Sequence, residues 1–153
     1  MAEKIKVLVD VMLKLANALN SGLDGVRKGK DTIEPFVFEY KVGWNLAKNA
    51  DILESHRRTH NKLTAALLKK HKLVSGEKLN EANRDRIIAM STEDADNRSR
   101  EIEISGILFV SIKDLFNERE ETIEVDGESK TVKVKNNIPQ SVLTALMPII
   151  KSE

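Results

Sequence analysis

The spacing of apolar residues near the start of the chain is that of an amphipathic helix. Apolar side chains recur every three or four positions, at Ile5, Leu8, Met12, Leu15 and Leu19. Gly22 follows, and a glycine just past a helix favours a left-handed cap. The pattern therefore predicts a helix that ends near Leu19. After it we expect a glycine-rich loop over residues 21–34, with room for one helical turn.

A second helical pattern runs from about Tyr40 to Lys72. Glu34 precedes Pro35, which biases the backbone toward extended geometry, so the chain should enter this helix as an extended segment. Its apolar stripe consists of Val42, Leu46, Ala50, Leu53, Leu63 and Leu67. At 1.5 Å per residue the helix would be about 50 Å long. A helix of this length needs a bundle or an oligomer to bury its stripe.

After a turn at Ser75–Gly76, residues 77–98 predict a mostly exposed helix with few apolar residues. The period then changes to two. Ile102 and Ile104 alternate with glutamates, which indicates a strand, and residues 122–134 form two alternating runs around an Asp-Gly turn, which predicts a β-hairpin. A lone hairpin is marginally stable in water. We therefore expect its aliphatic face to dock on the helices, on the 102–104 strand or on another subunit.

The chain closes with a short helix, for which Asn137 is the expected N-cap and Pro139 the first-turn proline. Helices first, then strands, then a helix is the order of an α+β protein. We predict one predominantly helical domain over residues 1–153. Residues 1–98 would form a long-helix bundle, and residues 101–153 a small antiparallel sheet or hairpin with a C-terminal helix.

Composition excludes several classes of protein. The chain has 25 Lys and Arg against 24 Asp and Glu, so it lacks the basic excess of a protein that grips nucleic acid through many phosphates. The absence of cysteine excludes disulfides, thiolate metal sites and a Cys nucleophile, and it fits a reducing cytoplasm. Charged residues interrupt the apolar N-terminus, so we expect neither a signal peptide nor a membrane span. The expected location is the cytoplasm.

The order of these pieces resembles a group of small tailed-phage proteins of unknown function. The resemblance rests on "LVDVMLKLANALN", "YKVGWNLAKN", "EIEI", "SIKDLF" and the ending "IPQSVLTALMPIIKSE". Relative to that pattern, the "VDGESK" hairpin is an insertion. The resemblance implies a viral origin and a small accessory protein that binds a host component or a host signalling molecule. It implies no functional residue.

Catalytic motifs do not emerge from the spacing. His56 and His60 lie four apart on the predicted long helix, a spacing that can bind zinc, but the metalloprotease motif needs Glu where Arg57 stands. No phosphate-binding glycine loop and no Ser–His–Asp set can be nominated. We therefore expect no enzyme, no cofactor and no metal site.

The second half of the long helix is basic, from Arg57 to Lys72. A solvated face near a helix C-terminus explains this simply, and an anion site for a nucleotide, a phosphate or an acidic partner is the alternative. Arg27, Lys28 and Lys30 could add to such a site. The only tyrosine and the only tryptophan, both near the start of the helix, are expected core or interface anchors, with stacking on a base as the alternative. The candidate ligand-binding residues are Arg57, Arg58, His60, Lys69, Tyr40 and Trp44.

Three functional hypotheses follow. The first is a non-catalytic phage accessory protein, a homo-oligomer built on the long helices, that binds and blocks a host factor. The second is an anti-defence protein that sequesters a nucleotide-like host signalling molecule between its subunits. The third is a component of virion or tail assembly.

Overall fold

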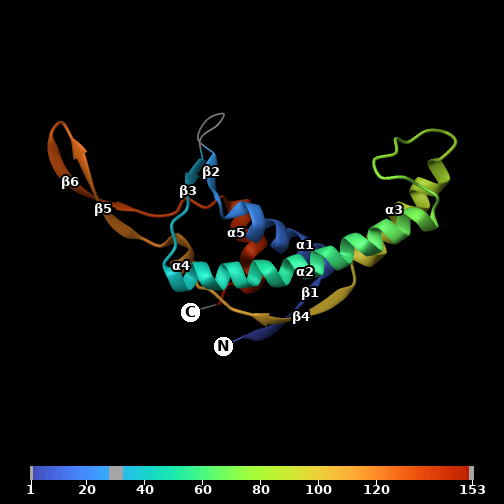
Figure 1. Cartoon of the computed structure of the whole chain (residues 1–153), viewed down its shortest axis with the longest axis horizontal. Helices are drawn as coiled ribbons and strands as arrows, with labels where there is room; N and C mark the ends of the chain where they lie inside the picture. Colours follow the sequence, from blue (N-terminus) through green and yellow to red (C-terminus); the bar gives the residue numbers. More distant parts are fainter. Residues whose placement is uncertain (1, 28–32, 152–153) are drawn as a thin grey trace.

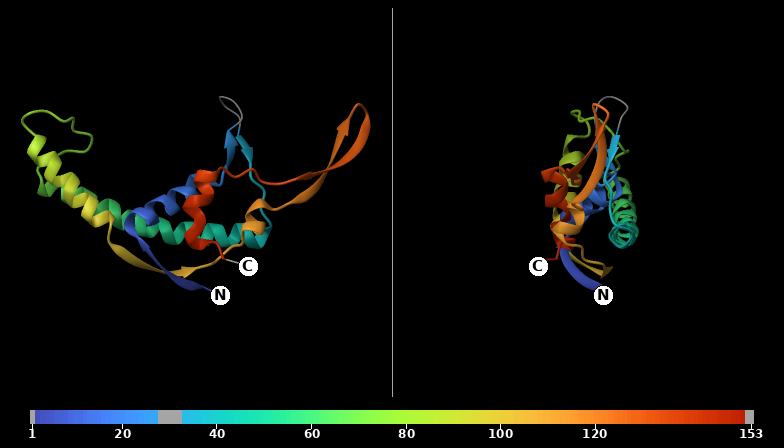
Figure 2. Two further views of the ribbon diagram at one scale, coloured as in Figure 1. Left: turned by 180° about the vertical axis from the view of Figure 1, so that it is seen from behind. Right: turned by 90° about the vertical axis from the view of Figure 1, so that its left-hand side faces the viewer.

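The structure, a computed structural model that describes residues 2–27 and 33–151, has a central body from which a helical arm and a β-hairpin project in opposite directions (Figures 1 and 2). Helices outweigh strands, and the described strands form two-stranded antiparallel sheets. The predicted α+β, predominantly helical class is therefore confirmed. The helical elements are α1 (Val9–Asn17), the π-helical η1 (Ala18–Gly22), α2 (Tyr40–Lys70), α3 (Arg84–Arg98), α4 (Ile112–Phe116), α5 (Gln140–Leu146) and the 3₁₀ turn η2 (Met147–Ile149). The strands are β1 (Glu3–Leu8), β2 (Gly25–Arg27), β3 (Ile33–Pro35), β4 (Glu101–Ile107), β5 (Arg119–Val125) and β6 (Glu128–Val134).

The hydrophobic core lies where α1, α2, β4 and α5 meet. Helix α2 crosses the whole body and turns Val42, Leu46 and Leu53 of the predicted stripe inward. Leu63 does not follow the prediction, because it is 63% exposed beyond the core. Leu15 from α1, Ile104 and Ile107 from β4, and Leu146 from α5 are fully buried against it. The predicted long helix is confirmed, and its extended entry is confirmed at Glu39 (φ −59°, ψ 149°). Among the described residues, no helix has both the length and the apolarity that crossing a membrane requires.

The prediction of a helix from Ile5 was wrong. Residues 3–8 form β1, which pairs antiparallel with β4 and places Ile5 opposite Ile104 and Val7 opposite Ile102. Helix α1 begins only at Val9. Gly22 lies inside η1 and does not form a left-handed cap. Its role is close packing, because a Cβ at this position would lie 3.1 Å from the Val142 side chain.

Three element boundaries also differ from the prediction. The expected loop over residues 21–34 contains the short pair β2–β3, although residues 28–32 lie outside the described chain. Helix α3 begins at Arg84 because the residues before it form a turn, in which the buried Asn83 amide donates to Lys78 O at 2.9 Å. Pro139 itself precedes α5 as the N-cap residue, so Asn137 does not cap this helix.

The β5–β6 hairpin pairs around Asp126–Gly127 as predicted. It does not dock on the helices or on β4, and in the described chain its two strands pack mainly on each other. It extends away from the body in Figure 1 and in the left-hand view of Figure 2. The prediction that the hairpin docks on its own chain was therefore wrong. Its docking on another subunit stays a prediction.

Candidate functional site

The aromatic pair of the sequence analysis lies at the start of α2 and faces solvent. Tyr40 is 83% exposed and Trp44 is 51% exposed, so neither anchors the core of this chain. Their ring centroids lie 6.3 Å apart with the planes tilted by 35°, and the Lys48 ammonium lies 5.0 Å from the Trp44 ring centroid. The predicted core role is wrong because Val42 and Leu46 take the inward face. An open aromatic surface beside a cation can pack against a partner or stack on a base.

The two arginines of the predicted anion site already have a partner on α2. Arg57 Nη2 lies 2.7 Å from Glu54 Oε2, and Arg58 Nε lies 3.7 Å from Glu54 Oε1. The hydrogen bond from Arg57 is the main cause that lowers the pKa of the Glu54 carboxyl, and the same bond raises the pKa of Arg57. Part of the positive charge of this segment is therefore neutralised along the helix.

The other predicted ligand residues lie far from the aromatic pair. His60 lines a hollow of about 480 Å³ between α2 and α3, where its Nε2 is 3.3 Å from Thr64 Oγ1. Lys69 is exposed on the last turn of α2. A continuous helix places Tyr40 and Lys69 about 43 Å apart. One chain therefore cannot bring all six candidate residues to one small molecule, and a ligand that touches both ends would need two copies.

The possible additions to the anion site fall outside what the structure describes. Lys28 and Lys30 lie in the undescribed segment, and the side chain of Arg27 is likewise not described. In the described part of the chain, no group of three or more His, Cys, Asp or Glu side chains could hold a metal ion.

A polar cluster ties the end of α2 to α3. Glu93 accepts a hydrogen bond from Lys70 Nζ at 2.7 Å, and its other carboxylate oxygen lies 2.8 Å from His71 Nε2. The bond from Lys70, and next the bond from His71, lower the pKa of the Glu93 carboxyl. The helical arm consists of the end of α2, the loop after it and α3. Since α3 contains no buried residue, this cluster contributes to holding the arm together.

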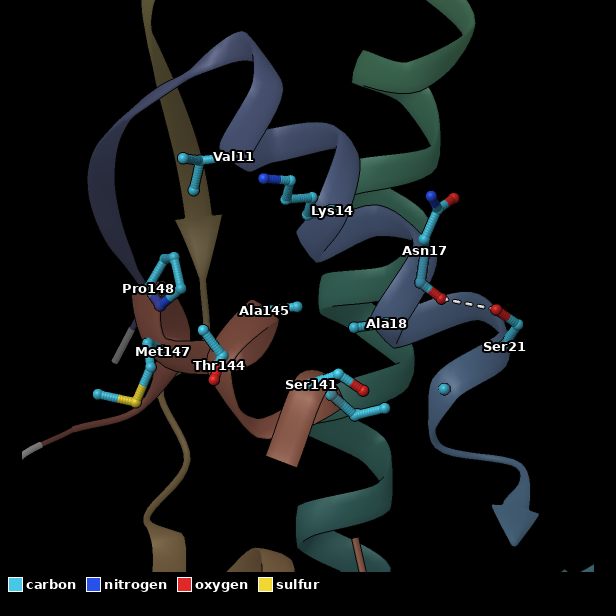
Figure 3. A pocket seen from close by; sticks show the side chains of 12 residues that line it. Val11, Lys14, Asn17, Ala18, Ser21, Ser141, Thr144, Ala145, Met147 and Pro148 are labelled. Atoms are coloured by element: carbon cyan, nitrogen blue, oxygen red, sulfur yellow. Dashed lines mark hydrogen bonds between the residues drawn. The ribbon is translucent and has the colours of Figure 1, made fainter. Parts of the chain in front are cut away.

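A groove that the sequence analysis did not find lies between α1–η1 and α5–η2 (Figure 3). Its volume is about 790 Å³. Small side chains hollow it, with Ala18 and Gly22 on one wall and Ala145 on the other, while Val11 and Met147 line it further along. Lys14, whose ammonium lies 3.3 Å from Asp10 Oδ2, and Ser21, whose hydroxyl donates to Asn17 O at 2.8 Å, also line it. The sequence signal for this groove is the set of small residues Ala18, Gly22 and Ala145, which carry neither charge nor an aromatic ring.

Buried Asn136 fixes the root of the hairpin. Its side-chain amide donates to Val37 O at 2.7 Å and to Leu115 O at 2.8 Å, and its Oδ1 accepts from Val37 N at 2.9 Å. Val37 belongs to the segment that enters α2. The hairpin therefore leaves the body in a defined direction, although the strands β5 and β6 themselves do not pack on the body.

Compared with known proteins, the chain matches no family model, no curated protein and no solved structure.

Proposed function

We propose that this chain is a non-catalytic binding protein that works as a homo-oligomer and blocks a protein of a host cell. One observation carries the proposal. The chain exposes 10783 Å² of accessible surface, whereas a compact monomer of 17.2 kDa exposes about 7,800 Å². The excess of about 3,000 Å² is large for a chain of 153 residues.

One subunit interface would cover about 1,000–2,500 Å² on each copy, which is a large part of this excess. Obligate homodimers bury roughly 2,000–5,000 Å² in total, shared between two copies. The projecting elements also carry exposed apolar side chains, which on a soluble protein mark interaction surfaces when they gather. On the helical arm and its connecting loop they are Leu63, Val74, Leu79 and Ile88, and on the hairpin they are Ile123 and Val125.

The resemblance to small tailed-phage proteins supports a host protein as the target. The exposed aromatic pair at the start of α2 suits such a target, since Tyr and Trp are enriched where interfaces concentrate their binding energy. The test is affinity capture from a bacterial host lysate, followed by reconstitution from purified components. We expect one captured protein to form a complex of fixed stoichiometry that a Trp44→Ala change weakens and an Asn61→Ala change does not. If no captured protein forms a complex with the purified chain, the blocking role is wrong.

A second function, sequestration of a nucleotide-like molecule, is favoured by the same aromatic pair because Lys48 lies beside the Trp44 ring. Base–aromatic stacking contributes about 1–3 kcal/mol per base. Trp44 is the only tryptophan, so its fluorescence reports directly on this surface. Titration with cyclic and linear nucleotides should quench that emission and release heat, and Tyr40→Leu should weaken both signals. No heat and no quenching, at protein concentrations well above micromolar, would exclude this function.

A further inference from the structure

We propose that the aromatic face of α2 packs against the same face of a second copy, so that the two long helices cross near Trp44. The inference rests on the proposed homo-oligomer and names one contact that builds it. Because Asn136 ties the root of the hairpin to Val37, in the segment that enters α2, this contact and a contact made by the hairpin can belong to one interface. An effect of Trp44→Ala on a host complex would then act through assembly.

Gly43 marks a place on α2 that the chain itself leaves open. Among the glycines in the described part of the chain, Gly43 alone has neither a positive φ nor a close contact, since a Cβ built on it would meet nothing within 4 Å apart from its own turn of the helix. Gly22, by contrast, packs against Val142. A glycine inside a helix lowers stability relative to alanine, because it has more conformational freedom to lose. No contact within the described chain requires this loss, so we look for the reason in a molecule that approaches from outside.

Two rows of side chains, each with a spacing of four residues, run side by side over this face of α2. The raised row consists of Tyr40, Trp44 and Lys48, and the low row consists of Gly43, Ala47 and Asp51. The rings of Tyr40 and Trp44 protrude, because they are 83% and 51% exposed. The core lies on the opposite side of the helix, and in the right-hand view of Figure 2 α2 runs along one edge of the molecule. The body of the chain therefore does not obstruct the two rows.

The shape of this face is complementary to itself. Rows with a spacing of four residues pack into one another when two helices cross at about −50°, which is the commonest class of helix packing. A two-fold axis along the rows places the raised row of each copy over the low row of the other. Tyr40 then faces the second copy's Gly43, and Trp44 faces the second copy's Ala47. The missing side chain of Gly43 leaves the room that the tyrosine ring needs.

Charge also favours a second copy as the occupant of this face. The same crossing brings Lys48 of each copy to the second copy's Asp51. Both side chains are exposed, and neither forms an ion pair with a described residue, since the contact of Lys48 is the Trp44 ring, whose centroid lies 5.0 Å from the ammonium. Two new ion pairs would therefore form in each dimer, one on each side of the contact.

Gly43→Gln tests this contact because it adds a side chain where the chain itself has room. Glutamine has a higher helix propensity than glycine, so a dilute sample of the variant should unfold at a temperature no lower than that of the wild type. We expect its self-association, measured by light scattering, to weaken at least about tenfold, because the new side chain would hold the two helices apart. Ala65→Gln is the matched control. Ala65 is exposed on the same helix far from the crossing, so this variant should associate as the wild type does.

A charge exchange identifies the second copy directly. Lys48→Glu alone and Asp51→Lys alone each place like charges across the contact, so each should weaken self-association at least about fivefold. In an equal mixture of the two variants both contacts regain opposite charges. The mixture should therefore associate as the wild type does. These variants also carry the test if Gly43→Gln does not fold.

The outcomes separate this inference from the proposed homo-oligomer. If the wild type is an oligomer, wild-type association of Gly43→Gln or no gain on mixing the charge variants overturns the inference and leaves the homo-oligomer standing. If Gly43→Gln abolishes a host complex and leaves self-association unchanged, the face belongs to the host protein and the inference is wrong. A wild type that is monomeric at every concentration overturns both.

Discussion

At the scale of single residues, three buried asparagines organise the described chain. Asn49, Asn83 and Asn136 are each almost completely buried, and each bonds a backbone group outside the regular elements, at Leu108, Lys78 and Val37 respectively. A primary amide suits this task because it donates and accepts at once. In α2, Asn49 donates to Leu108 O and accepts from Leu108 N, both at 2.8 Å. The end of β4 is thereby held against the long helix.

Asn49→Ala should destabilise the fold strongly for its size. The change leaves the Leu108 N–H and C=O without their partners, and each unsatisfied group costs about 1–3 kcal/mol when buried. We expect a loss of roughly 2–4 kcal/mol in the free energy of unfolding, measured by urea denaturation. Asn61→Ala is the matched control, since Asn61 is exposed on the same helix and its change should cost little. Equal stabilities of the two variants would contradict the role assigned to Asn49.

Glu93 should make the stability of the helical arm depend on pH in acidic solution. Its pKa is lowered below its ordinary 4.5 by Lys70 and His71, so the folded state favours the ionised form. The contribution is present above the ordinary pKa and is lost as the pH falls through the lowered value. Amide exchange of α3 should therefore accelerate as the pH falls below about 4.5, after correction for intrinsic rates.

Glu93→Gln provides the comparison. This variant should show faster exchange in α3 already at pH 6 and little further change on acidification, whereas Glu81→Gln, in the exposed loop before α3, should behave as the wild type. If the wild type and Glu93→Gln respond alike to acid, the cluster does not hold the arm.

Among the elements, the long segments with one clear apolar pattern were predicted correctly from the sequence. The prediction failed where the helical spacing of apolar residues overlaps with the alternation of a strand. Helix α2, β4 and the hairpin were expected close to their observed places, because each has one clear period and defined ends. Residues 3–8 were misassigned because Ile5 and Leu8 also fit the helical spacing of the following residues, while the alternation of Lys4, Ile5, Lys6 and Val7 favours a strand. Pairing with β4, a contact distant in sequence, decided between them.

The candidate site was predictable only in part, because its geometry also depends on how segments distant in sequence are placed in space. The exposed charges and aromatic residues were visible in the sequence, but their separation along α2 follows from the length of the helix. Asn49 stands at a stripe position, between Leu46 and Leu53, and a polar residue at such a position was the available sign of a buried amide. The groove depends on two helices from opposite ends of the chain, whose packing no local pattern reports.

The hairpin should contribute to assembly and not to the fold of one chain. Val125→Lys combined with Val132→Asp keeps the net charge and changes only the aliphatic face. Because Val125 is exposed, Val132 is only half-buried and the two strands pack mainly on each other, we expect the thermal midpoint of a dilute sample to change by a few degrees at most, a shift that corresponds to less than about 1 kcal/mol. Self-association should be lost.

Thr122→Lys combined with Thr131→Asp is the charge-matched control on the polar face. It should melt and associate as the wild type does. If the aliphatic-face variant also associates normally, the hairpin is a free arm, and contact with a different partner becomes its better explanation.

In the whole molecule, the proposed self-association follows from the large surface that one chain leaves exposed. The body has a core, but α3 contains no buried residue, and among the described residues the strands of the hairpin pack mainly on each other. Copies of the chain can provide that cover, and a bound host protein can add to it. The exposed surfaces of the arm and the hairpin would then serve both to bind a partner and to stabilise the assembled copies.

The most direct test is the molar mass in solution, measured by size-exclusion chromatography with light scattering over a wide range of concentration. We expect a mass of at least twice 17.2 kDa for the wild type and for the polar-face control, and a shift toward the mass of one chain for the aliphatic-face variant. A wild-type mass of 17.2 kDa at every concentration, including the highest, would contradict the proposed self-association.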